Sequence, residues 1–162
     1  MEGVLSKDIT TVGEYLQTWE LKIRTTKTVS AAFHHNNKET KRELKVKYNN
    51  KTLPFCSEST YLGVTVDRSF TYHQYLETLR KKLASCVALL TRLAGSSSGT
   101  GAKTLRIATL VLVQSTAEYC TPVWCHSAHT HLIDLAINDA LRIVTGCLRP
   151  TPADNLPILA GI

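Results

Sequence analysis

The spacing of apolar residues changes once along the chain, near residue 70, and divides it into two halves. Between residues 4 and 22 apolar side chains recur at steps of three and four, which predicts a helix with one buried stripe. The stripe consists of Val4, Leu5, Ile9, Val12, Leu16 and Trp19. Shorter runs typical of strands follow, so we expect the first half to place one helix against a small antiparallel sheet.

Three runs supply the expected strands. Residues 28–33 form a short β-prone run. Residues 44–48 alternate apolar and polar side chains, and the turn-forming pair Asn49-Asn50 separates them from residues 52–55. This arrangement predicts a hairpin. Residues 61–66 are predicted to form a further strand.

The second half has a helical period. From residue 71 apolar positions alternate steps of three and four, which predicts a long helix with a coiled-coil-like seam. The seam consists of Leu76, Leu79, Leu83, Cys86, Leu90 and Leu93. A glycine- and serine-rich segment, residues 95–101, ends this helix. Two further helices are predicted over about residues 103–119 and 130–145, the last with Gly146 as its C-cap.

These patterns together predict an α+β fold in three parts. Residues 1–67 form a subdomain of one helix and short strands, and residues 70–148 form a three-helix bundle. Residues 149–162 form a turn-rich tail. A chain of 162 residues has room for one domain or for two small subdomains that share a core.

Charge and composition narrow the possible classes of protein. Lysine and arginine exceed aspartate and glutamate by six, and the excess lies in the first two-thirds of the chain. Such a surface attracts nucleic-acid phosphates, although an ordinary solvated surface has the same composition. The chain lacks a bilayer-spanning apolar run and a signal-peptide pattern, so we expect an intracellular protein, nuclear or cytoplasmic, that is neither secreted nor in contact with a membrane. Five cysteines, an odd number, favour free thiols.

Thiols and imidazoles gather after the second predicted helix. The group consists of Cys120, Cys125, His126, His129 and His131. These side-chain types at this spacing are zinc ligands. The group also flanks Pro122-Val123-Trp124, an apolar turn of the kind in which cysteines are buried without a metal. The apolar turn is the favoured interpretation, and metal binding by this group stays open.

The carboxylates show no pattern of a catalytic centre. Nucleotidyl transfer by two metal ions needs a tight set of carboxylates to hold both Mg²⁺ ions. The aspartates are Asp8, Asp67, Asp134, Asp139 and Asp154. No two are adjacent, and none stands in a Tyr-x-Asp-Asp sequence after a strand. No serine or cysteine stands in a nucleophile motif either, so we predict neither an active site nor a metal site in this chain.

Several stretches, in this order, carry a resemblance to a known family. They are Tyr15-Leu16-Gln17-Thr18-Trp19-Glu20-Leu21-Lys22, Lys27-Thr28, Tyr61-Leu62-Gly63-Val64-Thr65-Val66-Asp67, Ala117-Glu118-Tyr119-Cys120-Thr121-Pro122-Val123-Trp124, the segment 141–150 and the segment 156–162. Together they resemble the end of the palm and the thumb of a non-LTR (LINE, jockey-like) retrotransposon reverse transcriptase. The resemblance covers nearly the whole chain, from about residue 4 to residue 162.

The resemblance implies roles for residues of the palm-like half. Lys27 corresponds to a lysine near the leaving pyrophosphate, where its ammonium would act as general acid if the rest of the palm were present. Tyr61, Leu62 and Gly63 match the primer grip, where glycine lets the backbone approach the primer terminus. A solvated lysine and a strand whose glycine relieves crowding are the alternatives. Arg24 stands where the family has a small polar residue, which makes the following loop uncertain to align.

The resemblance also implies partners for the helical half. Arg80, Lys81 and Lys82 would contact the phosphates of a duplex between an RNA template and a DNA primer. The alternative is an ordinary charged helix face. The complete enzyme of the family uses Mg²⁺, but the carboxylates that would hold the ion have no counterpart here, so no cofactor is expected for this chain.

The expected function is therefore that of a truncated reverse transcriptase, or RNA-directed DNA polymerase, which does not polymerise alone. Two alternatives stay open. One is a non-catalytic module that binds RNA or an RNA–DNA hybrid, and the other is a helical module whose seam binds another protein. Without the rest of the palm the small sheet would keep unpaired strand edges, so we expect an aggregation-prone product.

Overall fold

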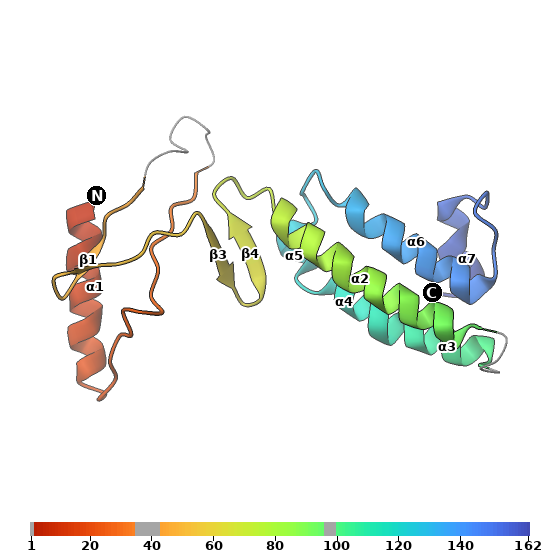
Figure 1. The fold of residues 1–162 in the computed structure, drawn as a ribbon, viewed down its shortest axis with the longest axis horizontal. Coiled ribbons are helices and arrows are strands. Elements are labelled where there is room, and N and C mark those ends of the chain that lie inside the picture. Colours follow the sequence, from red (N-terminus) through yellow and green to blue (C-terminus); the bar gives the residue numbers. More distant parts are fainter. Residues whose placement is uncertain (1, 35–42, 96–99) are drawn as a thin grey trace. The chain divides into compact units, whose positions relative to one another are not determined.

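The computed structural model describes residues 2–34, 43–95 and 100–162 and divides the chain into two compact units, residues 1–70 and 71–162. The predicted α+β class is confirmed, because helices combine with two small antiparallel sheets (Figure 1). Most of the glycine-rich segment after the long helix, residues 96–99, lies outside the described residues. None of the described helices has the length and apolarity to cross a bilayer.

Helix α1 (Glu2–Gln17) confirms the first predicted helix, but the predicted buried stripe is wrong. Val4, Val12 and Trp19 are more than half exposed, and Gly13 is the only buried residue of the helix. The covered face lies to one side of the stripe. There the Ser6 hydroxyl accepts a hydrogen bond from the backbone N–H of Lys47 at 3.0 Å. The helix is therefore fixed by a polar contact and a close approach at glycine rather than by its apolar residues.

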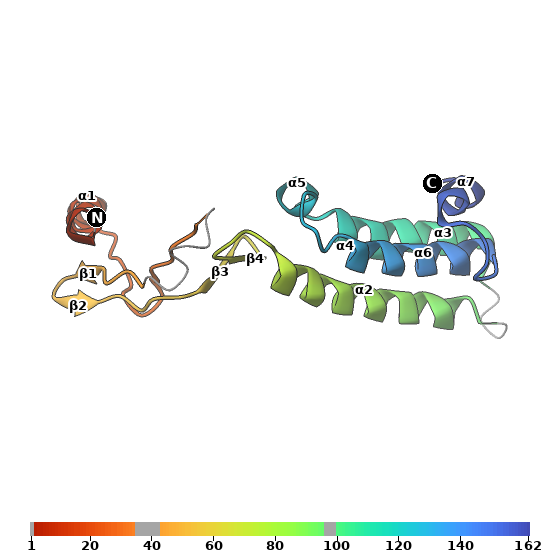
Figure 2. The ribbon, with the colours of Figure 1, turned by 90° about the horizontal axis from the view of Figure 1, so that it is seen from above.

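The predicted hairpin is confirmed and lies beside α1 (Figure 2). Strands β1 (Lys47–Tyr48) and β2 (Lys51–Thr52) pair antiparallel around Asn49-Asn50, both of which have positive φ. Asparagine tolerates this conformation better than most residues, which explains why the pair forms the turn. Beyond the strands, the Leu53 N–H donates to the carbonyl of Val46 at 2.8 Å and extends the pairing.

The two other strand predictions for this half differ from the structure. Residues 28–33 contribute one parallel bridge, Ser30 to Phe55, instead of a strand. The single strand predicted over residues 61–66 is a hairpin, with β3 (Glu58–Tyr61) paired antiparallel to β4 (Val64–Asp67). Leu62 and Gly63 both have positive φ and reverse the chain, which a strand does not permit. The described residues therefore hold two separate two-stranded sheets where one sheet was expected.

Helix α2 (His73–Leu93) confirms the long predicted helix. Leu76, Leu83 and Leu90 of its seam are completely buried. The seam packs on helices of its own unit (Figure 1). On one side lies α6 (His131–Thr145), and on another lies the segment from α3 (Ala102–Thr109) to α4 (Ser115–Glu118). A seam that is filled by its own chain is not free to bind another protein, so the interaction-module alternative loses the surface on which it depended.

The second predicted helix is continuous from Ala102 to Glu118 but is not uniform. It consists of α3 (Ala102–Thr109), a π-helical segment η2 (Leu110–Gln114) and α4 (Ser115–Glu118). Two hydroxyls bond backward near the π-helical segment. Buried Thr109 donates to the Leu105 carbonyl at 3.0 Å, and Ser115 donates to the Val111 carbonyl. Such bonds give helix carbonyls an alternative hydrogen-bond partner. π-Helical segments occur where the regular i→i−4 backbone hydrogen bonding of an α-helix is altered.

The chain ends with a helix that completes the bundle and a short helix that caps it. After α5 (Thr121–Trp124), α6 (His131–Thr145) confirms the third predicted helix, and Gly146 ends it with φ 69°. The predicted turn-rich tail contains a 3₁₀ turn, η3 (Ala153–Asn155), and α7 (Leu156–Ala160). Leu156 and Ala160 pack on Leu141 of α6. The tail is thus part of the core of this unit.

Candidate nucleic-acid interface

The predicted primer-grip residues form the tip of the β3–β4 hairpin. Tyr61 pairs with Val64, which leaves a two-residue turn of Leu62 and Gly63 with φ 48° and 82°. Two positive φ values in a two-residue loop match the twist of the flanking strands. Leucine pays a steric cost in this conformation, whereas glycine does not. The tip presents two apolar side chains to solvent, since Tyr61 and Leu62 are each more than 70% exposed.

Lys27, the predicted general acid, lies in an exposed turn after α1. Its N–H donates to the Arg24 carbonyl at 2.9 Å, and Thr28 bonds the same carbonyl through both its N–H and its hydroxyl at 3.0 Å. The carbonyl of Arg24, a residue that departs from the family pattern, is therefore the shared acceptor around which this loop closes. The side chains of Arg24 and Lys27 are both exposed.

The three basic residues of α2 are exposed but do not face one direction. Successive residues of a helix are rotated by about 100°, so Lys81 lies opposite the buried seam, while Arg80 and Lys82 flank it. Arg80 turns toward α6 and forms an ion pair with Glu77 at 3.6 Å. All three can contact phosphates only if the partner wraps around the exposed half of the helix.

A shallow groove runs between α2 and α6 on the side of Arg80. Small residues of α2, Ala84 and Ala88, form one wall, and Leu135 of α6, 64% exposed, forms part of the other. Its volume is about 410 Å³. The only charged residues of the groove lining are Arg80 and Asp139, of opposite sign, so the groove contributes little to an electrostatic surface for nucleic acid.

The carboxylates remain apart in the structure. Asp134 and Asp139 are both exposed on α6, five residues apart, so they point in different directions. Asp154 belongs to η3. Within the described ranges, no three side chains among histidine, cysteine, aspartate and glutamate come together as metal ligands would.

The cysteine and histidine residues around α5 lie in a compact turn. Trp124 is buried, and its indole N–H donates to the Tyr119 carbonyl at 3.0 Å, while the Tyr75 hydroxyl of α2 donates to the same carbonyl at 3.4 Å. The His129 ring lies edge-on to the ring of His73 with centroids 4.5 Å apart. All five cysteines of the chain are free thiols. This geometry is that of an apolar turn anchored on one carbonyl.

Burial and close neighbours change the acidity of two tyrosines at this turn. Burial raises the pKa of Tyr75, and the nearby Cys120 and Tyr119 raise it further. A side-chain hydrogen bond with Cys120 raises the pKa of Tyr119, and the charge of that thiol adds to the effect. Both phenols therefore ionise at a higher pH than an ordinary tyrosine, because the pKa of each is raised.

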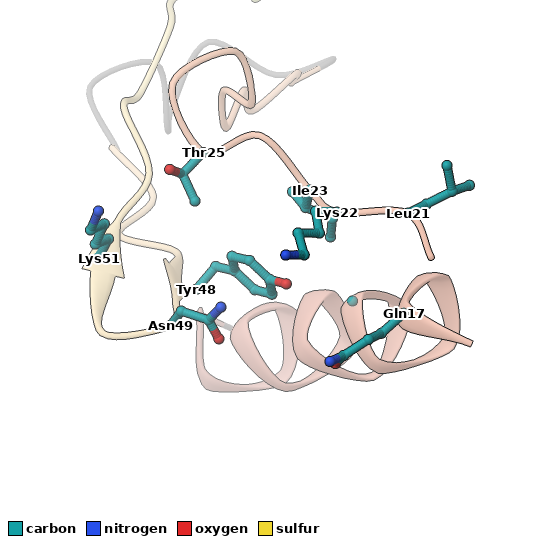
Figure 3. A pocket seen from close by; sticks show the side chains of 9 residues that line it. Gln17, Leu21, Lys22, Ile23, Thr25, Tyr48, Asn49 and Lys51 are labelled. Carbon is teal, nitrogen blue, oxygen red and sulfur yellow. The ribbon is translucent and has the colours of Figure 1, made fainter. Parts of the chain in front are cut away.

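The structure forms a cavity in the first unit that no sequence pattern predicted. Figure 3 shows Lys22 and Tyr48 pointing toward each other across it, with Lys51 on the side of the β1–β2 hairpin. Lys22 lies far in the sequence from Tyr48 and Lys51 of the hairpin, so only the folded chain brings it to the same cavity.

Comparison with known proteins relates part of the chain to a retrotransposon polyprotein. No protein-family model matches the chain, and no solved structure matches it. Over 122 residues the chain is 29% identical to the retrovirus-related Pol polyprotein from type-1 retrotransposable element R1 4 of Nasonia vitripennis. The matched region is 74% of this chain and 31% of that polyprotein. This similarity supports a retrotransposon-related origin for the chain.

Proposed function

We propose that this chain is the palm-end and thumb part of a reverse transcriptase of the LINE type, which binds nucleic acid and does not polymerise alone. The observation that carries the proposal is the β3–β4 hairpin, whose tip combines exposed Tyr61 and Leu62 with Gly63 at positive φ. The tip matches the primer-grip motif at the residues that carry the resemblance. Similarity to a retrotransposon Pol polyprotein supports the same origin.

The proposed ligand is the duplex of an RNA template and a DNA primer. The tip offers an aromatic ring and an uncrowded backbone, which suit a strand end with an unstacked base. The exposed cations of α2, Arg80, Lys81 and Lys82, supply phosphate contacts without reading sequence. Both surfaces are proposed for binding, and neither is assigned a chemical step.

A salt titration of hybrid binding tests the proposal. Three phosphate contacts predict a slope of about −2.7 for the logarithm of the binding constant against the logarithm of salt concentration, from about −0.9 per contact. Substituting Arg80, Lys81 and Lys82 together with glutamine should bring the slope close to zero. A matched variant with Lys7, Lys45 and Lys103 replaced by glutamine removes the same charge elsewhere and should keep most of the slope. Equal slopes for the two variants would reject α2 as the contact surface.

The hairpin tip requires a separate test. Tyr61→Ala removes the exposed ring and should weaken binding of a hybrid with a recessed primer end by roughly tenfold, as expected for one lost base stack. Binding of a blunt hybrid should change much less. In the same preparations, nucleotide incorporation without an added polypeptide should be undetectable, and its detection would overturn the proposal.

A further inference from the structure

A polar cavity of about 340 Å³ lies within the first unit, between α1, the loop that follows it and the β1–β2 hairpin (Figure 3). Its volume is near the lower end of the range for small-ligand sites, about 300 to 1,000 Å³. The donors that line it come from all three segments: Gln17, Lys22, Thr25, Tyr48, Asn49 and Lys51.

The charge of the lining has one sign. Two lysines contribute ammonium groups, and no carboxylate belongs to the lining. Neither lysine belongs to the ion pairs seen among the described residues between Glu77 and Arg80 and between Asp139 and Arg142. Lys22 and Lys51 thus bring two positive charges to a cavity whose lining holds no acid, which favours an anion there.

The cavity depends on a close contact between α1 and β1. Gly13 is the only buried residue of α1, and a Cβ at this position would come within 2.8 Å of the Tyr48 ring. Because glycine stands there, the Tyr48 ring and hydroxyl can approach the helix closely. Figure 3 shows the hydroxyl end of this ring on the side of the Lys22 ammonium, so a hydroxyl donor and a cation face the same part of the cavity.

We propose that this cavity binds a phosphate monoester dianion. Two ammonium groups match the charge of about −1.5 to −2 that such a group carries at neutral pH, and its oxygens accept hydrogen bonds from the hydroxyl and amide donors of Thr25, Tyr48 and Asn49. The residues of the hairpin tip and the basic residues of α2 do not line the cavity. The site is therefore additional to the proposed duplex surface.

The test uses the full chain labelled for NMR and titrated with inorganic phosphate at low ionic strength. We expect saturable shifts of the backbone amides of Thr25, Tyr48 and Asn49. Lys22→Gln and Lys51→Gln should each weaken binding by about fivefold, and the double variant by more than tenfold. A double variant with Lys45 and Lys47 replaced by glutamine is the matched control, since both are exposed on the same hairpin segment but do not line the cavity.

A variant that keeps both lysines provides a second test of phosphate binding. Gly13→Ala displaces Tyr48 but keeps both lysines, so it should weaken phosphate binding while the Lys45 and Lys47 control does not. Equal affinity of the two double-lysine variants, or shifts that never saturate, would overturn the proposal. Hybrid binding through α2 and the hairpin tip should be unchanged in Lys22→Gln, which separates failure of this site from failure of the proposed function.

The source of the phosphate is distinguished by the probe. Adenosine 5′-monophosphate represents a free mononucleotide, and a short single-stranded DNA with a 5′-phosphate represents a strand end. Tighter binding of the phosphorylated strand than of the mononucleotide assigns the cavity to strand ends, and equal binding assigns it to free phosphates. If the same strand with a 5′-hydroxyl binds as tightly as the phosphorylated one, the monoester assignment is wrong.

Discussion

The two units of the chain pack their first helices, α1 and α2, in different ways. In unit 2 the long side chains of α2 are enclosed by α6 and by the helical segment from α3 to α4. In unit 1 no large apolar residue of α1 is buried, because Val4, Leu5 and Val12 are exposed and Ile9 and Leu16 are only half-buried. The helix contacts the hairpin through Ser6 and Gly13. The six largest fully buried side chains of the described residues all belong to unit 2: Leu76, Leu83, Leu90, Val113, Ile133 and Leu156.

The number of buried apolar side chains differs between the two units, and so does the stability that each unit gains from its core. Burying a leucine or valine side chain contributes about 1.5 to 3 kcal/mol, so unit 2 has several such contributions. Among the described residues of unit 1, the buried hydrophobic ones are Ala32, Val46, Leu53 and Val64. Val4, Val12, Tyr15 and Trp19 are all more than half exposed, so they add no buried apolar surface to this unit. We infer that unit 2 is the stable part of the chain and that unit 1 is only marginally stable.

The largest expected effect comes from the core of unit 2. Leu83 is completely buried, so Leu83→Ala should lower the free energy of unfolding by about 2 to 5 kcal/mol. Val4→Ala on the exposed stripe of α1 should change it by no more than about 0.5 kcal/mol. Denaturant unfolding followed by helical circular dichroism measures both. Similar losses for the two variants would remove the contrast between the units.

A smaller effect is expected at the contact that holds α1. Gly13→Ala brings a methyl group within 2.8 Å of the Tyr48 ring, and overpacking of this kind costs about 1 to 3 kcal/mol. The helix propensity of alanine offsets about 1 kcal/mol of this. Gly3→Ala is the matched control, because nothing lies within 4 Å of its added Cβ, and it should stabilise α1. Amide exchange of α1 should quicken in the first variant and slow in the second.

The C-cap of α6 should show an effect of about 1 kcal/mol. Gly146 has φ 69° and nothing within 4 Å of an added Cβ, so Gly146→Ala tests the backbone conformation without a steric contribution. Gly146→Asn should cost less, because asparagine tolerates the left-handed region. Thermal unfolding of both variants gives the order. An alanine variant as stable as the wild type would show that this cap does not matter to unit 2.

The smallest effect is a dependence on alkaline pH. The raised pKa values of Tyr75 and Tyr119 mean that both phenols ionise more readily in the unfolded chain. Their contribution to stability is complete below the ordinary tyrosine pKa of about 10 and is lost as pH rises through the raised values. Unfolding free energies at pH 8 and pH 11 should therefore differ less in Tyr75→Phe than in the wild type. Tyr15→Phe, an exposed position of unit 1, should leave the difference unchanged.

Much of unit 2 could be predicted from the sequence because its pattern is local. Leucines at alternating steps of three and four predicted α2 and the buried side of it, and Gly146 predicted the end of α6. The π-helical segment at Leu110–Gln114 was missed, because it leaves the spacing of apolar residues along the helix unchanged. The packing of Leu156 on α6 was also missed, because a five-residue helix leaves almost no periodic signal.

Unit 1 was harder to predict because its contacts are not local. The spacing of apolar residues in α1 predicted a helix correctly. It could not show that the β1–β2 hairpin covers the face of α1 beside the apolar stripe instead of the stripe itself. Asn49-Asn50 identified one turn, whereas Leu62-Gly63 was hidden inside a β-prone run, because leucine is rare at positive φ. The roles of Lys27, Tyr61 and Arg80 stay predictions. The cavity at Lys22 required contacts between segments that no sequence pattern connects.

Native-state hydrogen–deuterium exchange of the full chain tests the inferred difference between the units most directly. The account predicts that amides of α2 and α6 exchange together and at least about a hundredfold more slowly than those of α1, which should open locally. Amides of α1 as protected as those of α2, in a monomer with no added partner, would contradict it.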